Sequence, residues 1–361
     1  MFKSRVICIK QQDSRAVFHL ESFFMNTLQS ILFSLCLLLL GYDKALLMCA
    51  QKNVVQDTQR HTIDSTYLKQ ADTFEQKEDY ASALECYKQH LTLYPRDSVA
   101  EYYVAYAQMR TKKLTETWTT CHRIIGYAPQ YAKPYYILGI LAQDSAHHNK
   151  AVQLLNKAFS LDTGLHNIHS LLAFSLYHVG KTERHEAYKD AIRHISIHLQ
   201  KDSTNGWSWY LRYAAQSEYG GGNPSALLLD INKAMQLLPD QYCMRVDRGR
   251  IFLDLQEPQK ALDDLDIALQ HNCQSTYLYG YQGSAYSQMG KHDLAEELFK
   301  KALVNGVLPM WLYSHRALMY YRKGDYLSAL ADIETYIRMS PTVSSEMTEF
   351  AVRLRDICAK M

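Results

Sequence analysis

Hydrophobic and polar residues alternate through residues 64–343 with the period of amphipathic helices, in stretches of about 13 residues separated by short polar turns. Stretches of this length suit helices and are too long for typical strands. The stretches come in pairs, and one pair with its turns occupies about 34 residues. The pattern therefore predicts an all-α chain built from repeated helix–turn–helix units.

Small residues recur at the same interval. A first series is spaced by 34 residues, with one slip of eight: Ala71, Ala105, Gly139, Ala173, Ala215, Gly249, Gly283 and Ala317. Two further series follow the first: Ala83, Ala151, Ala261, Ala295 and Ala329, and then Ala158, Ala234, Ala268 and Ala302. We place the first series where two antiparallel helices approach most closely, because a larger side chain would push them apart. The other two series share one face of the second helix.

Prolines and glycines mark the expected helix ends. Pro95, Pro129, Pro239 and Pro341 follow second helices, whereas Pro224 and Pro258 are placed to open helices at the first turn, where the missing N–H costs little. Glycine in VGK (179–181), MGK (289–291) and KGD (323–325) is expected between the two helices of a repeat. There it can close the first helix in a left-handed conformation.

Two segments carry nearly the full pattern: YYILGILAQDSAHHNKAVQLLNKAFSLD (135–162) and YGYQGSAYSQMGKHDLAEELFKKALVNG (279–306). They resemble the tetratricopeptide repeat, in which an aromatic residue is followed by Gly, Ala, a large residue and Ala. The resemblance implies a right-handed α-solenoid of eight such repeats, at 64–97, 98–131, 132–165, 166–207, 208–241, 242–275, 276–309 and 310–343. Residues 344–361 would form a capping helix.

Two departures qualify the resemblance. The second repeat has Thr117 where Ala is expected, so its helix pair should pack less tightly. The fourth repeat is eight residues longer than the others, which we attribute to an extended second helix. A break is expected near there, dividing an N-terminal block at 64–207 from a C-terminal block at 208–343.

The N-terminal segment differs from the rest of the chain. Residues 31–40, ILFSLCLLLL, have the length of the apolar core of a secretory signal, and Ala50 precedes a polar stretch. We therefore treat residues 1–50 as a signal or targeting segment, cleaved near Ala50, and residues 51–63 as a linker. The chain is expected to be exported to the periplasm or cell envelope of a bacterium. The alternatives are a start at Met25, a retained membrane anchor, and lipid attachment at Cys49.

The amino-acid composition limits the kinds of partner that can be expected. Among 361 residues, 47% are hydrophobic and 21% charged, and the net charge is only +2, without a long basic run. This composition is that of a folded domain and argues against nucleic acid as a partner. Past the signal the cysteines are Cys86, Cys121, Cys243, Cys273 and Cys358. Their odd number and spacing predict small buried residues with at most one disulfide, and no zinc site.

Candidate chemistry is sparse. The chain lacks the common phosphate-loop, dinucleotide, metalloprotease and nucleophile-elbow motifs, so no enzyme, cofactor or metal is expected. In KALDDLDIAL (260–269), Asp263, Asp264 and Asp266 are close in sequence, but Asp264 lies about 100° from Asp263 on a helical wheel and the three cannot converge on one ion. We interpret them as the solvated face of a helix. The fourth repeat's histidines receive the same interpretation: His166, His169, His178, His185, His194 and His198.

A surface remains as the candidate site. In proteins similar to this one, the first helix of each pair lines a concave groove that holds a peptide, and its exposed positions here are rich in Tyr and Arg, which are typical of interaction hot spots. The predicted groove residues are Tyr102, Tyr106, Arg110, Tyr136, Phe174, Tyr177, Arg212, Tyr213, Arg250, Tyr277, Tyr281, Tyr321 and Arg322. For any single residue the alternative is packing between repeats.

The expected function is a non-catalytic scaffold that binds a partner protein or peptide in this groove. The alternative is a structural component of an envelope assembly or secretion complex that uses the convex surfaces. Chaperone-binding members of the family hold a C-terminal carboxylate with a Lys/Asn clamp. The corresponding exposed residues here are Leu68 and Asp72, so a co-chaperone of that type is not expected.

Overall fold

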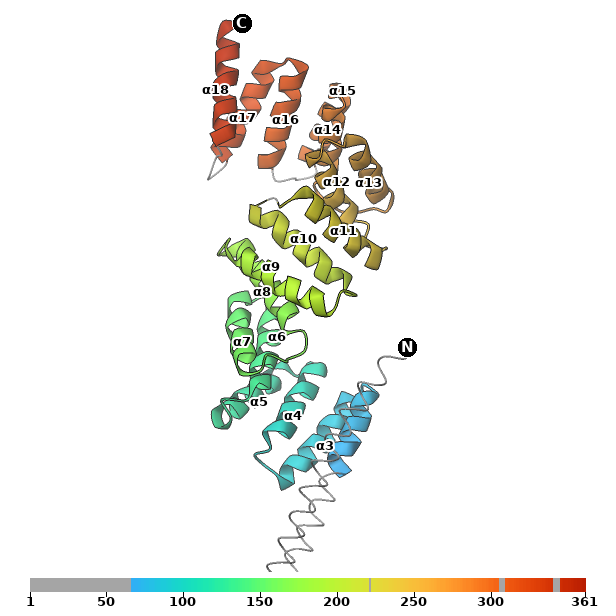
Figure 1. Cartoon of the computed structure of the whole chain (residues 1–361), viewed down its shortest axis with the longest axis vertical. Helices are drawn as coiled ribbons and strands as arrows, with labels where there is room; N and C mark the ends of the chain where they lie inside the picture. The colour runs from blue at the N-terminus through green and yellow to red at the C-terminus, as the bar shows by residue number, and fades with distance from the viewer. Residues whose placement is uncertain (1–65, 221, 305–308, 340–344) are drawn as a thin grey trace, which may run out of the picture. The chain divides into compact units, whose positions relative to one another are not determined.

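The computed structural model describes residues 66–220, 222–304, 309–339 and 345–361 (Figure 1). Throughout these ranges the regular elements are α-helices, and no strand occurs. This confirms the predicted all-α helical repeat fold of the solenoid class. The expected signal and linker, residues 1–63, lie outside the described residues.

Each of the eight expected repeats contains two helices. They are helical residues 66–76 with α3 (Tyr80–Leu93), α4 (Ser98–Arg110) with α5 (Leu114–Tyr127), α6 (Ala132–Asp144) with α7 (His148–Leu161), α8 (Ile168–Thr182) with α9 (Ala187–Lys201), α10 (Gly206–Gly220) with α11 (Pro224–Leu237), α12 (Met244–Asp254) with α13 (Pro258–Gln270), α14 (Leu278–Gln288) with α15 (His292–Val304), and α16 (Pro309–Lys323) with α17 (Tyr326–Met339). The final helix, α18 (Ser345–Lys360), packs against α17, as expected of a cap.

Two compact units make up the chain, and they divide between Ile137 and Leu138. In the first unit, α4 packs against α3 on one side and α5 on the other. In the second unit, successive helices from α7 to α18 pack against one another, α9 against α10 included. The proposed division into blocks at 207–208 stays a prediction.

The predicted small residues form the core of both units. Every alanine of the three series is 0% exposed. The glycines mark close approaches, since a Cβ on Gly139 would lie 2.7 Å from the Leu155 side chain, and one on Gly283 would lie 3.0 Å from Phe299. The interpretation of the first series as the point of closest helix contact is therefore confirmed. Thr117 is also fully buried, and its hydroxyl donates to the Lys113 carbonyl at 2.9 Å within α5.

The turns between paired helices use a left-handed residue at a fixed position. Gly290 and Gly324 have φ of +76° and +86°, as predicted. Gly180 does not serve this role, because it lies inside α8, where a Cβ would meet the Tyr188 ring at 2.8 Å. In four other repeats the equivalent residue is not glycine: Glu78, Lys112, Ala146 and Gln256. In the fourth repeat α8 and α9 have 15 residues each, whereas α6 and α7 of the third repeat have 13 and 14, so the extension is not confined to its second helix.

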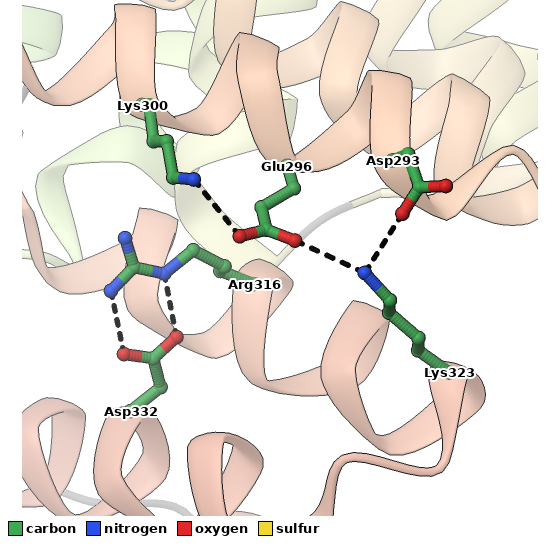
Figure 2. Close-up of polar contacts among 6 residues, drawn as sticks. All are labelled: Asp293, Glu296, Lys300, Arg316, Lys323 and Asp332. Carbon is green, nitrogen blue, oxygen red and sulfur yellow. Dashed lines mark hydrogen bonds and ion pairs between the residues drawn. The ribbon is translucent and has the colours of Figure 1, made fainter.

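Buried aspartates on second helices bind arginines of the first helices. Arg316 of α16 donates two hydrogen bonds to Asp332 of α17, both at 2.7 Å (Figure 2). Arg248 makes the same two-pronged contact with Asp264, at 2.6 and 2.7 Å, and Arg245 adds a third bond at 2.8 Å. These ion pairs join the two helices of a repeat. Figure 2 also shows Lys323 of α16 contacting carboxylates of α15, a link between neighbouring repeats.

The interpretation of Asp263, Asp264 and Asp266 as a solvated face is wrong for one of them. Asp263 and Asp266 are exposed, but Asp264 is 3% exposed and ion-paired. The apolar residue Leu269 of the same stretch is 41% exposed. Asp264 is thus a structural residue, because its ion pairs with Arg245 and Arg248 hold α13 to α12.

One disulfide connects the ends of the sixth repeat. Cys243, the residue before α12, is bonded to Cys273, just after α13, with their Cα atoms 5.4 Å apart. Cys86, Cys121 and Cys358 are free. The prediction of at most one disulfide is consistent with this arrangement for the cysteines in the described residues.

Candidate functional site

In the first unit, predicted groove residues gather in a tyrosine cluster on α4 and the start of α6. The Tyr102 ring lies 6.3 Å from that of Tyr106, centre to centre, and the Lys133 ammonium lies 4.7 Å from the Tyr102 ring centre. Arg110 donates to the Tyr106 hydroxyl at 3.0 Å. Arg110 is exposed, whereas Tyr102, Tyr106 and Tyr136 are half-buried. Burial raises the pKa of Tyr102 and Tyr136, so both keep their hydroxyl protons at neutral pH.

In the second unit, the first helices of five repeats contribute to a shared face. α8 packs against α10, α12 against α14, and α14 against α16, and side-chain bonds connect α10 to α12. We call this surface the first-helix face. Its members are Phe174 and Tyr177 of α8, Tyr210 and Ser217 of α10, Asp247, Arg250 and Asp254 of α12, Tyr277 just before α14, Tyr281 of α14, and Trp311, His315 and Arg322 of α16.

A polar network crosses this face between α10 and α12. The Tyr210 hydroxyl donates to Asp247 at 2.9 Å. Arg250 donates to the Ser217 hydroxyl at 2.6 Å and to Asp254 at 3.1 Å. Burial raises the pKa of Asp247, while the Tyr210 hydrogen bond and the nearby Arg250 charge oppose that shift. These groups largely satisfy one another, which favours a rigid surface over a reactive centre.

An aromatic platform lies between α14 and α16, formed by Tyr277, Tyr281 and Trp311. The Trp311 ring centre is 5.6 Å from that of Tyr277 and 5.1 Å from that of Tyr281. Gly280 makes this packing possible, because a Cβ there would lie 2.4 Å from the Trp311 ring. His315 packs edge-on against Trp311, and its Nδ1 lies 3.0 Å from the Ser284 hydroxyl. The platform thus offers large aromatic rings with a polar border.

The predicted residues differ in their accessibility. Phe174 and Tyr277 are 39% and 37% exposed, and Arg322 is also exposed. Tyr177, Arg250 and Tyr281 are half-buried on the first-helix face.

Three predicted residues serve packing instead. Tyr213 is 3% exposed, so its assignment to an exposed position is wrong. Arg212 is engaged by Asp230 through two hydrogen bonds, and the Tyr321 ring packs against Phe350 of the capping helix. Tyr213 is therefore not available as a primary contact for a partner, whereas Arg212 and Tyr321 are half-buried.

Sequence reasoning missed Trp311, His315 and Asp247. The repeat period could have found them, because Trp311 and His315 lie 34 residues after Tyr277 and Tyr281. Asp247 likewise lies 34 residues after Tyr213. The prediction had read exposed positions of the first helices but kept only Tyr, Phe and Arg, so it passed over other residue types at equivalent positions of the repeat.

Other chemistry is limited in the described part of the chain. No group of three or more His, Cys, Asp or Glu side chains there could hold a metal ion. His169, His194 and His198 are 9%, 8% and 6% exposed, so their interpretation as solvated is wrong. An open depression of about 530 Å³ lies in the first unit, lined by α3, α4 and α5. None of the described helices has both the length and the apolarity required to span a bilayer.

Comparisons with known proteins agree with the repeat pattern. Residues 66–101 and 281–344 match two family models that are both described as tetratricopeptide repeat. Two Drosophila melanogaster proteins, Hsc70-interacting protein 1 and 2, are each 30% identical over 92 residues, which is 26% of this chain. The chain matches only 24% of the length of these relatives.

Solved structures with similar folds are distant in sequence. A tetratricopeptide repeat protein from Parabacteroides merdae is 14% identical with a TM-score of 0.43, covering 72% of this chain and 99% of that one. A chain of the APC/C hetero-tetramer Cut9–Hcn1 is 14% identical with a TM-score of 0.48, and the match covers 80% of this chain and 55% of that one. YrrB, described as a TPR protein with an unusual peptide-binding site, is 18% identical with a TM-score of 0.43, and the match covers 56% of this chain and 97% of that one.

The family matches coincide with helix pairs of the structure. Residues 66–101 include helical residues 66–76 and α3, and residues 281–344 include α15, most of α14, and the pair α16 and α17. Proteins built from this repeat are generally scaffolds for protein interactions. The chain therefore contains tetratricopeptide repeats at these two segments, within an all-α helical repeat fold.

Proposed function

We propose that the protein is a non-catalytic scaffold that binds a partner protein or peptide on the first-helix face, the groove implied by the family resemblance. One observation carries the proposal: accessible aromatic rings and a guanidinium occur together on the adjacent helices α14 and α16. Tyr, Trp and Arg supply most of the binding energy at protein interfaces, because they combine large contact area with a polar group. The self-satisfied network around Asp247 supports a binding role over a catalytic one.

A photo-crosslinking experiment in the producing organism tests this proposal. With p-benzoylphenylalanine in place of Tyr277, we expect a specific crosslinked partner, because that side chain is exposed beside the platform. The matched control carries the crosslinker at Leu294 of α15, a second helix, where the side chain is 48% exposed. Adding Tyr281→Ala should reduce the Tyr277 crosslink. Crosslinks from Leu294 alone would contradict binding on the first-helix face.

A second candidate function is a structural part of an envelope assembly or secretion complex. Exposed leucines on second helices favour it: Leu229 of α11, Leu294 of α15 and Leu327 of α17 are 58%, 48% and 67% exposed. Apolar side chains on that side could contact assembly neighbours. The Leu294 crosslinker therefore also serves as the probe for this candidate.

We also propose that the protein is exported to a bacterial cell envelope. The apolar segment 31–40 supports this location, and so does the bond between Cys243 and Cys273, because disulfides persist mainly in oxidising compartments. We expect the mature protein to begin near residue 51 and to carry the disulfide. N-terminal sequencing and thiol labelling of protein from fractionated cells measure both. An uncleaved chain with free Cys243 and Cys273 in the cytoplasmic fraction would contradict the proposal.

A further inference from the structure

The helices that carry the aromatic platform contain no acidic residue. α14 (LYGYQGSAYSQ) has no charged side chain at all. α16 (PMWLYSHRALMYYRK) has three cations, Arg316, Arg322 and Lys323, and no carboxylate. Any negative charge that neutralises these cations must come from another element or from a partner.

Two of the three cations are neutralised within the repeat array. Asp332 binds Arg316 through both carboxylate oxygens, and Asp293 and Glu296 bind Lys323 at 2.8 and 3.2 Å (Figure 2). Salt bridges of this kind leave little net charge at these positions. Neither cation is therefore a strong attractant for an anionic partner.

Arg322 is different. In the described part of the chain its guanidinium makes no ion pair, and its hydrogen bond is a weak donation to the Ser287 hydroxyl at 3.4 Å. Partial burial lowers the pKa of Arg322, with no carboxylate to offset the loss of hydration. The side chain is nevertheless exposed to solvent. A carboxylate from outside could approach it and form a charge-assisted hydrogen bond.

Arg322 and the platform lie along one side of α16. Trp311, His315, Leu318 and Arg322 follow the spacing of one helical face, and Leu318 is 39% exposed. Trp311 and Arg322 are eleven residues apart, which corresponds to about 16 Å along the helix. In an extended peptide that distance is covered by about five residues.

We infer that the partner is an acidic peptide segment, whose carboxylate binds Arg322 while an apolar or aromatic side chain about five residues away packs on Tyr277, Tyr281 and Trp311. This inference rests on the proposed function and specifies its ligand. A phosphate backbone fits less well, because nucleic-acid binding requires several unneutralised cations and α14 and α16 together offer only Arg322. The platform residues beside Arg322 are neutral and aromatic, which suits contact with an apolar or aromatic side chain of a protein.

Fluorescence polarisation with designed peptides tests the inference on the full chain. The probes are fluorescein-labelled nonapeptides of Gly and Ser with one Phe and, three to six positions later, one Glu. Matched sets carry Gln or Lys instead of Glu. We expect Glu peptides to bind about tenfold more tightly than Gln peptides, the size of one charge-assisted hydrogen bond, and Lys peptides to bind more weakly still.

Variants assign the preference to its residues. Arg322→Ala should remove the difference between Glu and Gln peptides while leaving Gln binding unchanged, and Trp311→Ala should weaken both sets. Lys301→Ala, which removes an exposed cation from α15, is the matched control and should preserve the preference.

Equal binding of Glu and Gln peptides to the unaltered chain would overturn the inference, as would the absence of binding by every set. If the Tyr277 crosslink persists in either case, the scaffold function stands and only the acidic ligand is wrong. If the crosslink is also absent, both proposals fail. Retention of the Glu preference by Arg322→Ala would show that another cation selects the ligand.

Discussion

Replacing Asp264 with Ala should lower the free energy of unfolding by about 3–5 kcal/mol, the range expected when one partner of a buried ion pair is removed. Asp264 is 3% exposed and accepts three hydrogen bonds from Arg245 and Arg248. Without the carboxylate, two partly buried guanidinium groups remain between α12 and α13 with no counter-charge. Urea unfolding followed by circular dichroism measures the loss.

The neighbouring acid provides a matched control. Asp263 is exposed, and its described hydrogen bond is one from the Gln259 amide at 3.0 Å, so Asp263→Ala should change stability by less than about 0.5 kcal/mol. Equal stability of the two variants would contradict the structural role of Asp264. Replacing Asp264, Arg245 and Arg248 together by apolar residues should recover much of the loss, because the uncompensated charges are then absent.

The repeat architecture could be predicted because its determinants are local and periodic. Helix contact requires a small residue at one position of each pair, so the alanine and glycine series fixes both the period and the close contacts. Gly180 shows the limit of that reasoning. A glycine near a helix end serves a left-handed turn or a close contact equally well, and only the position of Tyr188 distinguishes them.

Burial of charge was harder to predict than burial of apolar residues. A helical wheel separated Asp264 from Asp263 by about 100° but could not show the arginines that approach Asp264 from α12. The sequence does contain a signal, since Arg248 and Asp264 recur two periods later as Arg316 and Asp332. An opposite-charge pair that repeats in phase indicates a structural contact.

The candidate site could be predicted only in part, because a helical wheel does not show which residues of neighbouring helices approach a side chain. Position on a first helix correctly selected accessible residues such as Tyr277 and Arg322. It could not separate them from Tyr213, which occupies an equivalent position two periods before Tyr281 but is enclosed by α11 and its neighbours. Accessibility at one repeat position depends on the size of the residues that the adjacent repeats supply there.

Histidines of the fourth repeat should make the protein less stable as the pH falls from about 6.5 to 4. His169 and His194 are buried between α8 and α9, with their Nδ1 atoms 2.9 Å apart, so one ring donates and the other must stay unprotonated there to accept. Burial, followed by the neighbouring His169 and Arg193, lowers the pKa of His194 to about 4. Burial also lowers the pKa of His169 and His198.

The direction of the pH effect follows from proton binding. Between pH 6.5 and 4 the unfolded chain protonates His194 and the folded chain does not, so acidification favours unfolding, by about 3 kcal/mol for a shift of this size. His194→Gln removes that titration and should flatten the fall in unfolding free energy measured between pH 7.5 and 4. Hydrogen exchange should localise the effect to α8 and α9. The exposed His147→Gln is the matched control, and an unchanged slope in His194→Gln would show that other groups govern the acid sensitivity.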